Sequence, residues 1–262
     1  MILTILGGGG FRVPLVYEAV AAARDRVRVD EVVLLDDDPG RLAVMAEVLA
    51  QAGRDSSAPA GRQVPRVRAT TDLDEALTGA DVIFSAVRVG GTAGRTRDER
   101  VALGEGLLGQ ETVGPGGLAY ALRTVPEVDR IAARIAELAP RAWTISFTNP
   151  ASIVTEAMRA RLGDRVVGIC DTPISLVRRA LRAVGLDARA FDRGEAEIDY
   201  AGLNHLGWLR GIRVGGEDLL PGLLADDAAL AGLEEARLMG GRLAAGARRR
   251  AQRVPVLLRL HA

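Results

Sequence analysis

Short apolar runs alternate along this chain with segments whose apolar residues recur at helical spacing. Uncharged runs of this kind predict buried strands, whereas spacings of three and four residues predict amphipathic helices. The expected strands span residues 1–6, 32–35, 67–71, 81–87, 144–148 and 166–169. The expected helices in the first half span residues 13–29, 41–52 and 72–77. Strands that alternate with helices predict a parallel sheet with helices on both faces.

Four consecutive glycines follow the first expected strand. The helix after them begins near Val13, and Pro14 fits only in its first turn. A strand, a glycine turn and a helix N-terminus together favour a pyrophosphate site, because the helix offers unpaired N–H groups. The G-x-G-x-x-G pattern lacks its third glycine in either register, so an ordinary strand-to-helix turn is the alternative. The expected cofactor-binding residues here are Gly7, Gly8, Gly9, Gly10, Phe11 and Arg12.

An acidic run ends the second expected strand. Asp36 lies where the ribose diol of NAD would be held, and Asp37 and Asp38 follow it. Three carboxylates there would repel a 2′-phosphate, which favours NAD over NADP. The alternative, a solvated acidic turn, applies more to Asp37 and Asp38 than to Asp36. The pattern predicts a Rossmann-like domain that binds NAD.

Two later residues have the chemistry of metal ligands. Cys170 follows an apolar strand, and His205 lies in a segment that can return to the same edge of the sheet. A thiolate, an imidazole and open positions for oxygen would suit a catalytic divalent metal. Buried packing for Cys170 and a core position for His205 are the alternatives.

Composition narrows the function classes. The 262 residues have zero formal net charge, which gives no argument for nucleic acid or an anionic membrane surface. No leader segment and no long apolar span are evident, and a single cysteine fits a reducing compartment. We therefore expect a cytoplasmic protein without a membrane or nucleic-acid partner.

Several ordered motifs carry a family resemblance that runs from residue 1 to about residue 240. They are 87–91, Arg95, 98–100, 109–112, 114–117, 147–151, 168–174 and 202–206. Together they resemble the NAD-dependent glycosidases of glycoside hydrolase family 4, an exception to the two-carboxylate scheme of glycoside hydrolysis.

The resemblance implies roles for particular residues. Cys170 and His205 match ligands of a divalent metal, usually Mn²⁺. Asn149 matches a sugar contact and Arg95 a position associated with the 6-phosphate. Glu111 and Asp171 lie in motifs linked to catalysis, although a carboxylate at a helix start is the alternative for Glu111. The further substrate-binding residues expected from these motifs are Arg88 and Asn204.

The resemblance also implies a mechanism that involves oxidation. NAD takes hydride from C3 of the sugar, and a Tyr removes the proton from C2. The glycosidic oxygen then leaves C1, water adds, and the ketone is reduced again, so no net redox change results. The expected substrate is a phosphorylated disaccharide or aryl glucoside, and the full-length relatives are expected to be homo-oligomers.

Two features bear on the anomer. The residue after the metal-binding Cys tracks substrate in the family, and Asp171 at this place matches the 6-phospho-α-glucosidases. The motifs 88–91 and 109–117 look more like the 6-phospho-β-glucosidases. We therefore predict a 6-phospho-β-glucosidase, with the α enzyme as the alternative. A dehydrogenase of the lactate and malate type and an inactive NAD-binding remnant are also compatible with the sequence.

The expected organisation is an NAD-binding domain over residues 1–170, the start of an incomplete α+β metal and substrate domain over 171–243, and a tail over 244–262. The sequence changes character from about Ala244, residues 254–261 have no family counterpart, and the Tyr motif expected after residue 243 is absent. A frameshift near Leu243 would explain these observations. We then expect weak NAD binding, at most traces of glycosidase activity, and uncovered apolar surface around Trp208, Leu209 and residues 219–224.

Overall fold

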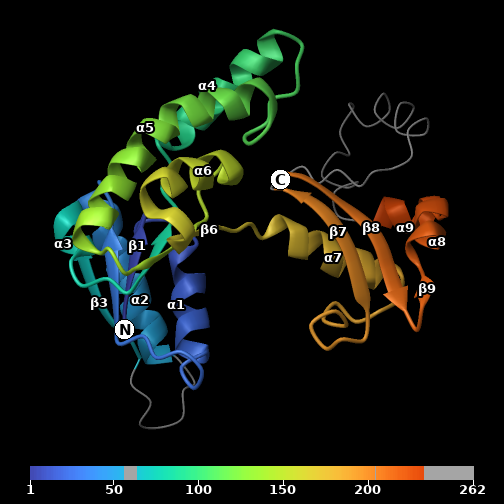
Figure 1. Cartoon of the computed structure of the whole chain (residues 1–262), viewed down its shortest axis with the longest axis horizontal. Coiled ribbons are helices and arrows are strands. Elements are labelled where there is room, and N and C mark those ends of the chain that lie inside the picture. Colours follow the sequence, from blue (N-terminus) through green and yellow to red (C-terminus); the bar gives the residue numbers. More distant parts are fainter. Residues whose placement is uncertain (56–63, 204, 233–262) are drawn as a thin grey trace. The chain divides into compact units, whose positions relative to one another are not determined.

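The computed structural model describes residues 1–55, 64–203 and 205–232 (Figure 1). Its contacts divide the chain into two compact units. The first unit is Met1–Ile169, and the second begins at Cys170. The expected tail over 244–262 lies outside the described residues, as does Asn204. Each unit is described by itself below.

The first unit is built on a six-stranded sheet, in the order β3-β2-β1-β4-β5-β6. Every neighbouring pair of strands is parallel. This confirms the Rossmann-like fold, because the strand order reverses beside β1 and places a switch point there. The strands are β1 Ile2–Leu6, β2 Glu31–Leu35, β3 Arg66–Thr70, β4 Val82–Ser85, β5 Trp143–Ser146 and β6 Val166–Gly168.

Helices cover both faces of this sheet. Successive residues of β1 point to opposite faces, so Ile5 joins one apolar cluster and Leu6 the other. The first cluster holds α1 and α2, and the second holds α3, α5 and α6. The helices are α1 Val13–Ala22, α2 Pro39–Asp55, α3 Leu73–Leu77, α4 Gly91–Gly104, α5 Gly114–Leu138 and α6 Ala151–Leu162, followed by the 3₁₀ turn Gly163–Arg165.

The helix expected over residues 13–29 is shorter than predicted. It begins at Val13 with Pro14 in its first turn, as expected, but it ends at Ala22. The N–H of Arg26 donates to the carbonyl of Ala23 at 2.8 Å, which turns the chain. Val29 then enters the core ahead of β2. The apolar side chain of Val29 therefore belongs to the segment that leads into β2 and not to α1.

The second unit has a three-stranded antiparallel sheet, in the order β7-β8-β9. Apolar side chains from α7, β8 and α8 form its core. Leu209, Leu220 and Leu223 are buried there, so the expected uncovered surface at these residues is wrong. The elements are α7 Thr172–Ala183, β7 Glu197–Leu203, β8 Leu206–Val214, β9 Glu217–Asp218, α8 Leu220–Ala225 and α9 Asp227–Gly232.

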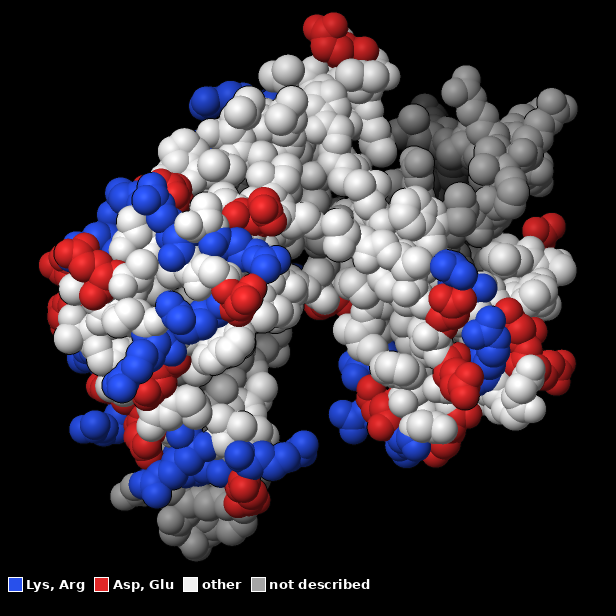
Figure 2. Space-filling view, viewed as in Figure 1, with Lys and Arg blue, Asp and Glu red and all other residues white. Residues whose placement is uncertain are grey.

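Charged side chains are mixed on the surface. On the face shown in Figure 2, basic and acidic groups lie interspersed over both units. In the part of the chain that the structure describes, no helix is both long and apolar enough to span a membrane.

Candidate cofactor, phosphate and metal sites

The glycine turn after β1 is packed tightly against β2. The N–H groups of Gly7 and Gly8 both donate to the carbonyl of Leu35, at 2.9 and 2.7 Å. Gly7 has φ +85°, a conformation that favours glycine. A Cβ on Gly8 would lie 2.8 Å from Cβ of Leu34. Both glycines are therefore needed for this close approach at the carboxyl edge of the sheet.

Asp36 holds the glycine turn from the end of β2. Its Oδ2 accepts a hydrogen bond from the N–H of Gly9 at 2.9 Å, and its Oδ1 accepts from the N–H of Asp38 at 3.2 Å. Asp38 in turn accepts from the N–H groups of Gly40 and Arg41 at the start of α2. Asp38 is thus a helix cap and not merely a solvated carboxylate, whereas Asp36 links the two segments expected at a dinucleotide.

Aromatic rings flank the start of α1. The guanidinium carbon of Arg12 lies 5.2 Å from the ring centroid of Phe11 and 4.9 Å from that of Phe147. Phe11 is 80% exposed, while Phe147 follows β5 at the same edge of the sheet. Arg12 therefore lies between the glycine turn and the end of β5.

Two of the predicted arginines, Arg88 and Arg95, meet at the buried carboxylate of Glu111, which was also predicted. Nη1 of Arg88 lies 2.5 Å from Oε1 of Glu111, and Nη1 of Arg95 lies 3.6 Å from Oε2. The Arg88 contact is a close charge pair, and Oε1 of Glu111 accepts no hydrogen bond from the residues that the structure describes. Nε of Arg95 also donates to Glu99 at 2.7 Å. Glu111 is buried, whereas both arginines are partly open to solvent.

The position of Glu111 depends on two glycines in the first turn of α5. A Cβ on Gly116 would lie 2.4 Å from the carbonyl oxygen of Gln110, and one on Gly117 would lie 2.2 Å from that of Thr112. The segment 110–112 therefore packs directly on the helix. Glu111 precedes α5 by three positions and faces two arginines. It is therefore not a carboxylate in the first turn of the helix.

Asn149 follows β5 and is half-buried. The peptide bond between Asn149 and Pro150 is cis, and α6 begins directly afterwards at Ala151. A residue before proline is disfavoured in a helix, as the sequence suggested. The amide of Asn149 thus lies at the carboxyl edge of the sheet, beyond Ser146.

In the second unit, Cys170 and His205 come together from distant parts of the sequence. Sγ of Cys170 lies 4.0 Å from Nε2 of His205. The N–H of Thr172 donates to the same sulfur at 3.4 Å, and Oδ1 of Asp171 is 4.0 Å from it. His205 is buried and has φ +55°, at the turn between β7 and β8.

The environment of Cys170 favours its thiolate. Burial raises the pKa of the thiol, but contacts from His205 and Thr172 outweigh burial, so the pKa lies below its ordinary value. A thiolate is the form of cysteine that binds metals. The site therefore presents a soft anionic ligand beside an imidazole.

The donor set fits a divalent metal. A sulfur and an imidazole nitrogen 4.0 Å apart can approach one ion with small side-chain adjustments. Nδ1 of His205 is buried without a hydrogen-bond partner among the residues that the structure describes. Over residues 1–55, 64–203 and 205–232, no group of three or more His, Cys, Asp or Glu side chains gathers in this way.

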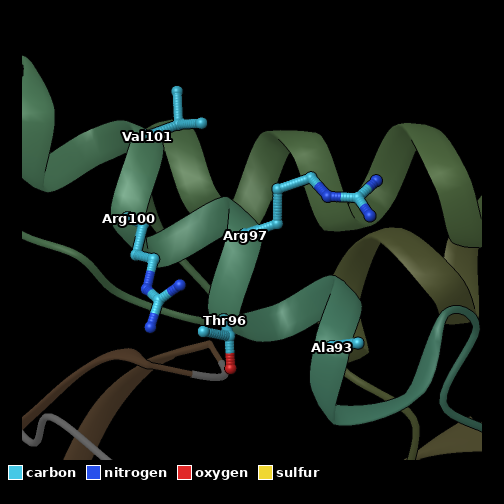
Figure 3. Close-up of a pocket in the computed structure, with 5 residues that line it drawn as sticks. All are labelled: Ala93, Thr96, Arg97, Arg100 and Val101. Carbon is cyan, nitrogen blue, oxygen red and sulfur yellow. The ribbon is translucent and has the colours of Figure 1, made fainter.

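The structure also gathers residues that the sequence did not single out as site residues. Tyr120 and Arg123 lie one turn apart on α5, close to Arg88. In the sequence, the spacing of three residues within an amphipathic helix is the signal that could have indicated that Tyr120 and Arg123 lie on the same side. Figure 3 shows a separate hollow on α4 whose lining residues include none of the predicted ones, namely Ala93, Thr96, Arg97, Arg100 and Val101.

Comparisons with known proteins agree with these features. Residues 2–186 match the model described as Family 4 glycosyl hydrolase. The chain is 43% identical over 157 residues to 6-phospho-alpha-glucosidase 1 of Lacticaseibacillus paracasei, across 59% of this chain and 35% of that protein. It is 34% identical over 222 residues to the 6-phospho-beta-glucosidase of Escherichia coli, across 84% of this chain and 47% of that protein.

Among solved structures, the chain is similar to a 6-phospho-alpha-glucosidase from gut microorganisms in complex with NAD and Mn²⁺. The TM-score is 0.75 at 31% identity, across 86% of this chain and 50% of that one. In each of these three comparisons the match spans half or less of the relative's length.

Proposed function

The chain belongs to family 4 of the glycosyl hydrolases, and we propose that it carries the sites of an NAD- and divalent-metal-dependent 6-phospho-β-glucosidase. The observation that carries this proposal is the approach of Cys170 and His205, 35 positions apart, to 4.0 Å. Family membership favours a glycosidase over the dehydrogenase alternative. The names of the relatives include both anomers, so the preference for β rests on the motifs of this chain.

We assign the dinucleotide to the edge formed by the glycine turn and β2. Gly7 and Gly8 allow the backbone to turn sharply, and Asp36 fixes Gly9. The start of α1 then presents its positive end to a pyrophosphate. A solved relative contains NAD, which supports this choice of cofactor.

We assign the metal to Cys170 and His205, with Mn²⁺ as the preferred ion because a solved relative contains it. When bound, NAD supplies a hydride acceptor, and the metal supplies Lewis acidity toward sugar hydroxyl oxygens. Asp171 lies beside the sulfur and is exposed, so its carboxyl can serve as the acid that protonates the leaving glycosidic oxygen.

We assign the 6-phosphate to Arg88 and Arg95. Each guanidinium has five N–H donors, so it can contact Glu111 and still bind phosphate oxygens. Their side chains are 35% and 42% exposed, which leaves room for a ligand. Glu111 holds the two cations near each other. We assign Asn149, which follows β5, to a sugar hydroxyl. Asn204 retains its expected role as a substrate contact, although it lies outside the described residues.

A 6-phospho-α-glucosidase is the second candidate. It is favoured by Asp171 after the metal-binding cysteine and by the relative at 43% identity.

The anomer and the cofactor requirement can be tested in one assay. With NAD and Mn²⁺ present, the chain should release p-nitrophenol faster from the 6-phospho-β-glucoside than from the α anomer. Even a trace rate is enough for this assay. The assay compares the rates on the two anomers, and it compares the rates with and without NAD and EDTA. Faster release from the α anomer would overturn the β preference. Net formation of NADH, or a rate indifferent to EDTA and to omission of NAD, would overturn the proposed reaction.

A further inference from the structure

Arg123 of α5 is held by a buried carboxylate. Its Nη1 and Nη2 donate to the two oxygens of Asp98 at 3.2 and 2.6 Å. Its Nε donates to the carbonyl of Val89 at 3.0 Å. Asp98 is 9% exposed, so this bidentate pair is largely shielded from water. Arg123 therefore joins α4 and α5 to the segment that follows β4.

The first turn of α4 is shaped to receive this guanidinium. Gly90 precedes the helix with φ +81°, and a Cβ there would lie 2.8 Å from Nε of Arg123. A Cβ on Gly94 would lie 3.1 Å from Nη2. The two glycines thus let the Arg123 side chain approach the backbone at the start of α4 closely.

Tyr120 provides a second connection between the two arginines. The guanidinium carbons of Arg123 and Arg88 lie 5.6 and 5.7 Å from its ring centroid. Tyr120 is 4% exposed, and burial raises the pKa of its phenol. The neutral ring offers its face to both cations. Arg123 therefore bonds the residue that follows Arg88 and shares the ring of Tyr120 with Arg88.

We propose that Arg123, fixed by Asp98, is a positioning residue that holds Arg88 ready for the phosphate group of the substrate. This proposal rests on the proposed function of Arg88. Arg88 has a long side chain that is 35% exposed, and it also faces Glu111. Orienting it before the ligand arrives lowers the entropic cost of binding. Without Arg123, the carbonyl of Val89 next to Arg88 would lose its hydrogen bond. The ring of Tyr120, which Arg88 contacts, would lose its second cation.

The test is the affinity of the full chain for glucose 6-phosphate, measured by calorimetry, with NADH affinity measured in parallel. Arg123→Lys keeps the charge but loses the planar fork. We expect it to raise the Kd for glucose 6-phosphate about tenfold, the lower end of the roughly 10 to 100-fold lost when an outer-shell partner is removed at a metal site. The Kd for NADH should not change. Asp98→Asn is the second variant and should act in the same direction.

A matched control is the pair formed by Arg161 and Asp129, which is also bidentate, at 2.9 and 3.0 Å, but exposed. Arg161→Lys and Asp129→Asn should leave both affinities unchanged. If the wild type binds glucose 6-phosphate and both clamp variants, Arg123→Lys and Asp98→Asn, bind it equally well, the positioning role is wrong. A parallel loss of NADH affinity would indicate a structural role only and would also overturn it. If the wild type does not bind glucose 6-phosphate, the proposed phosphate site itself fails.

Discussion

Gly117→Ala is expected to lower the free energy of unfolding by about 2 to 3 kcal/mol, the upper part of the roughly 1 to 3 kcal/mol typical of overpacking. The new Cβ would lie 2.2 Å from the carbonyl oxygen and 2.3 Å from the carbonyl carbon of Thr112. Both are backbone atoms, so the segment that carries Glu111 must move away from α5. This cost exceeds the roughly 1 kcal/mol that alanine gains over glycine inside a helix. Urea unfolding of the full chain measures the difference.

Gly104→Ala is the matched control. Gly104 is the last residue of α4, and a Cβ added there would have nothing within 4 Å. We expect this variant to be as stable as the wild type or more stable, by up to about 1 kcal/mol. Equal unfolding midpoints for Gly117→Ala and Gly104→Ala would contradict the close packing of residues 110–112 on α5.

Gly8→Ala is expected to weaken NADH binding at least about tenfold, which corresponds to about 1.4 kcal/mol. Its Cβ would lie 2.8 Å from Cβ of Leu34 and 2.9 Å from the backbone nitrogen of Leu35. The glycine turn must then shift away from β2 and from Asp36. Fluorescence titration with NADH measures the loss, and Gly104→Ala again serves as the control. Unchanged NADH affinity in Gly8→Ala would place the dinucleotide elsewhere.

The centre of the sheet could be predicted because β1 and β2 are short apolar runs whose side chains are mostly buried. Residues 32–35 carry that signal without help from the rest of the chain, whereas residues 144–148 alternate polar and apolar side chains. The end of α1 could not be predicted in the same way. Ala23 and Val27 continue the helical spacing, but a turn at Ala23 ends the helix and Val29 enters the core. Long-range packing decided this boundary.

The candidate sites show a similar division. Asp36 could be located from its place after β2, because strand ends converge at the edge of a parallel sheet. Its hydrogen bond to Gly9 depends on side-chain geometry that no spacing encodes. Arg123 was missed because an arginine in an amphipathic helix normally faces water. Only the fold brings it to a buried Asp98.

The most direct test is the affinity of the chain for Mn²⁺, measured by electron paramagnetic resonance titration. We expect one site in the wild type. Cys170→Ser and His205→Asn should each weaken it by more than the 10 to 100-fold that is roughly lost with an outer-shell partner. Asn is chosen at position 205 because it tolerates the positive φ found there. Asp192→Asn, at an exposed carboxylate of the same unit, should bind Mn²⁺ as the wild type does. Wild-type affinity in both the Cys170 and the His205 variants would contradict the assignment of the metal to this pair.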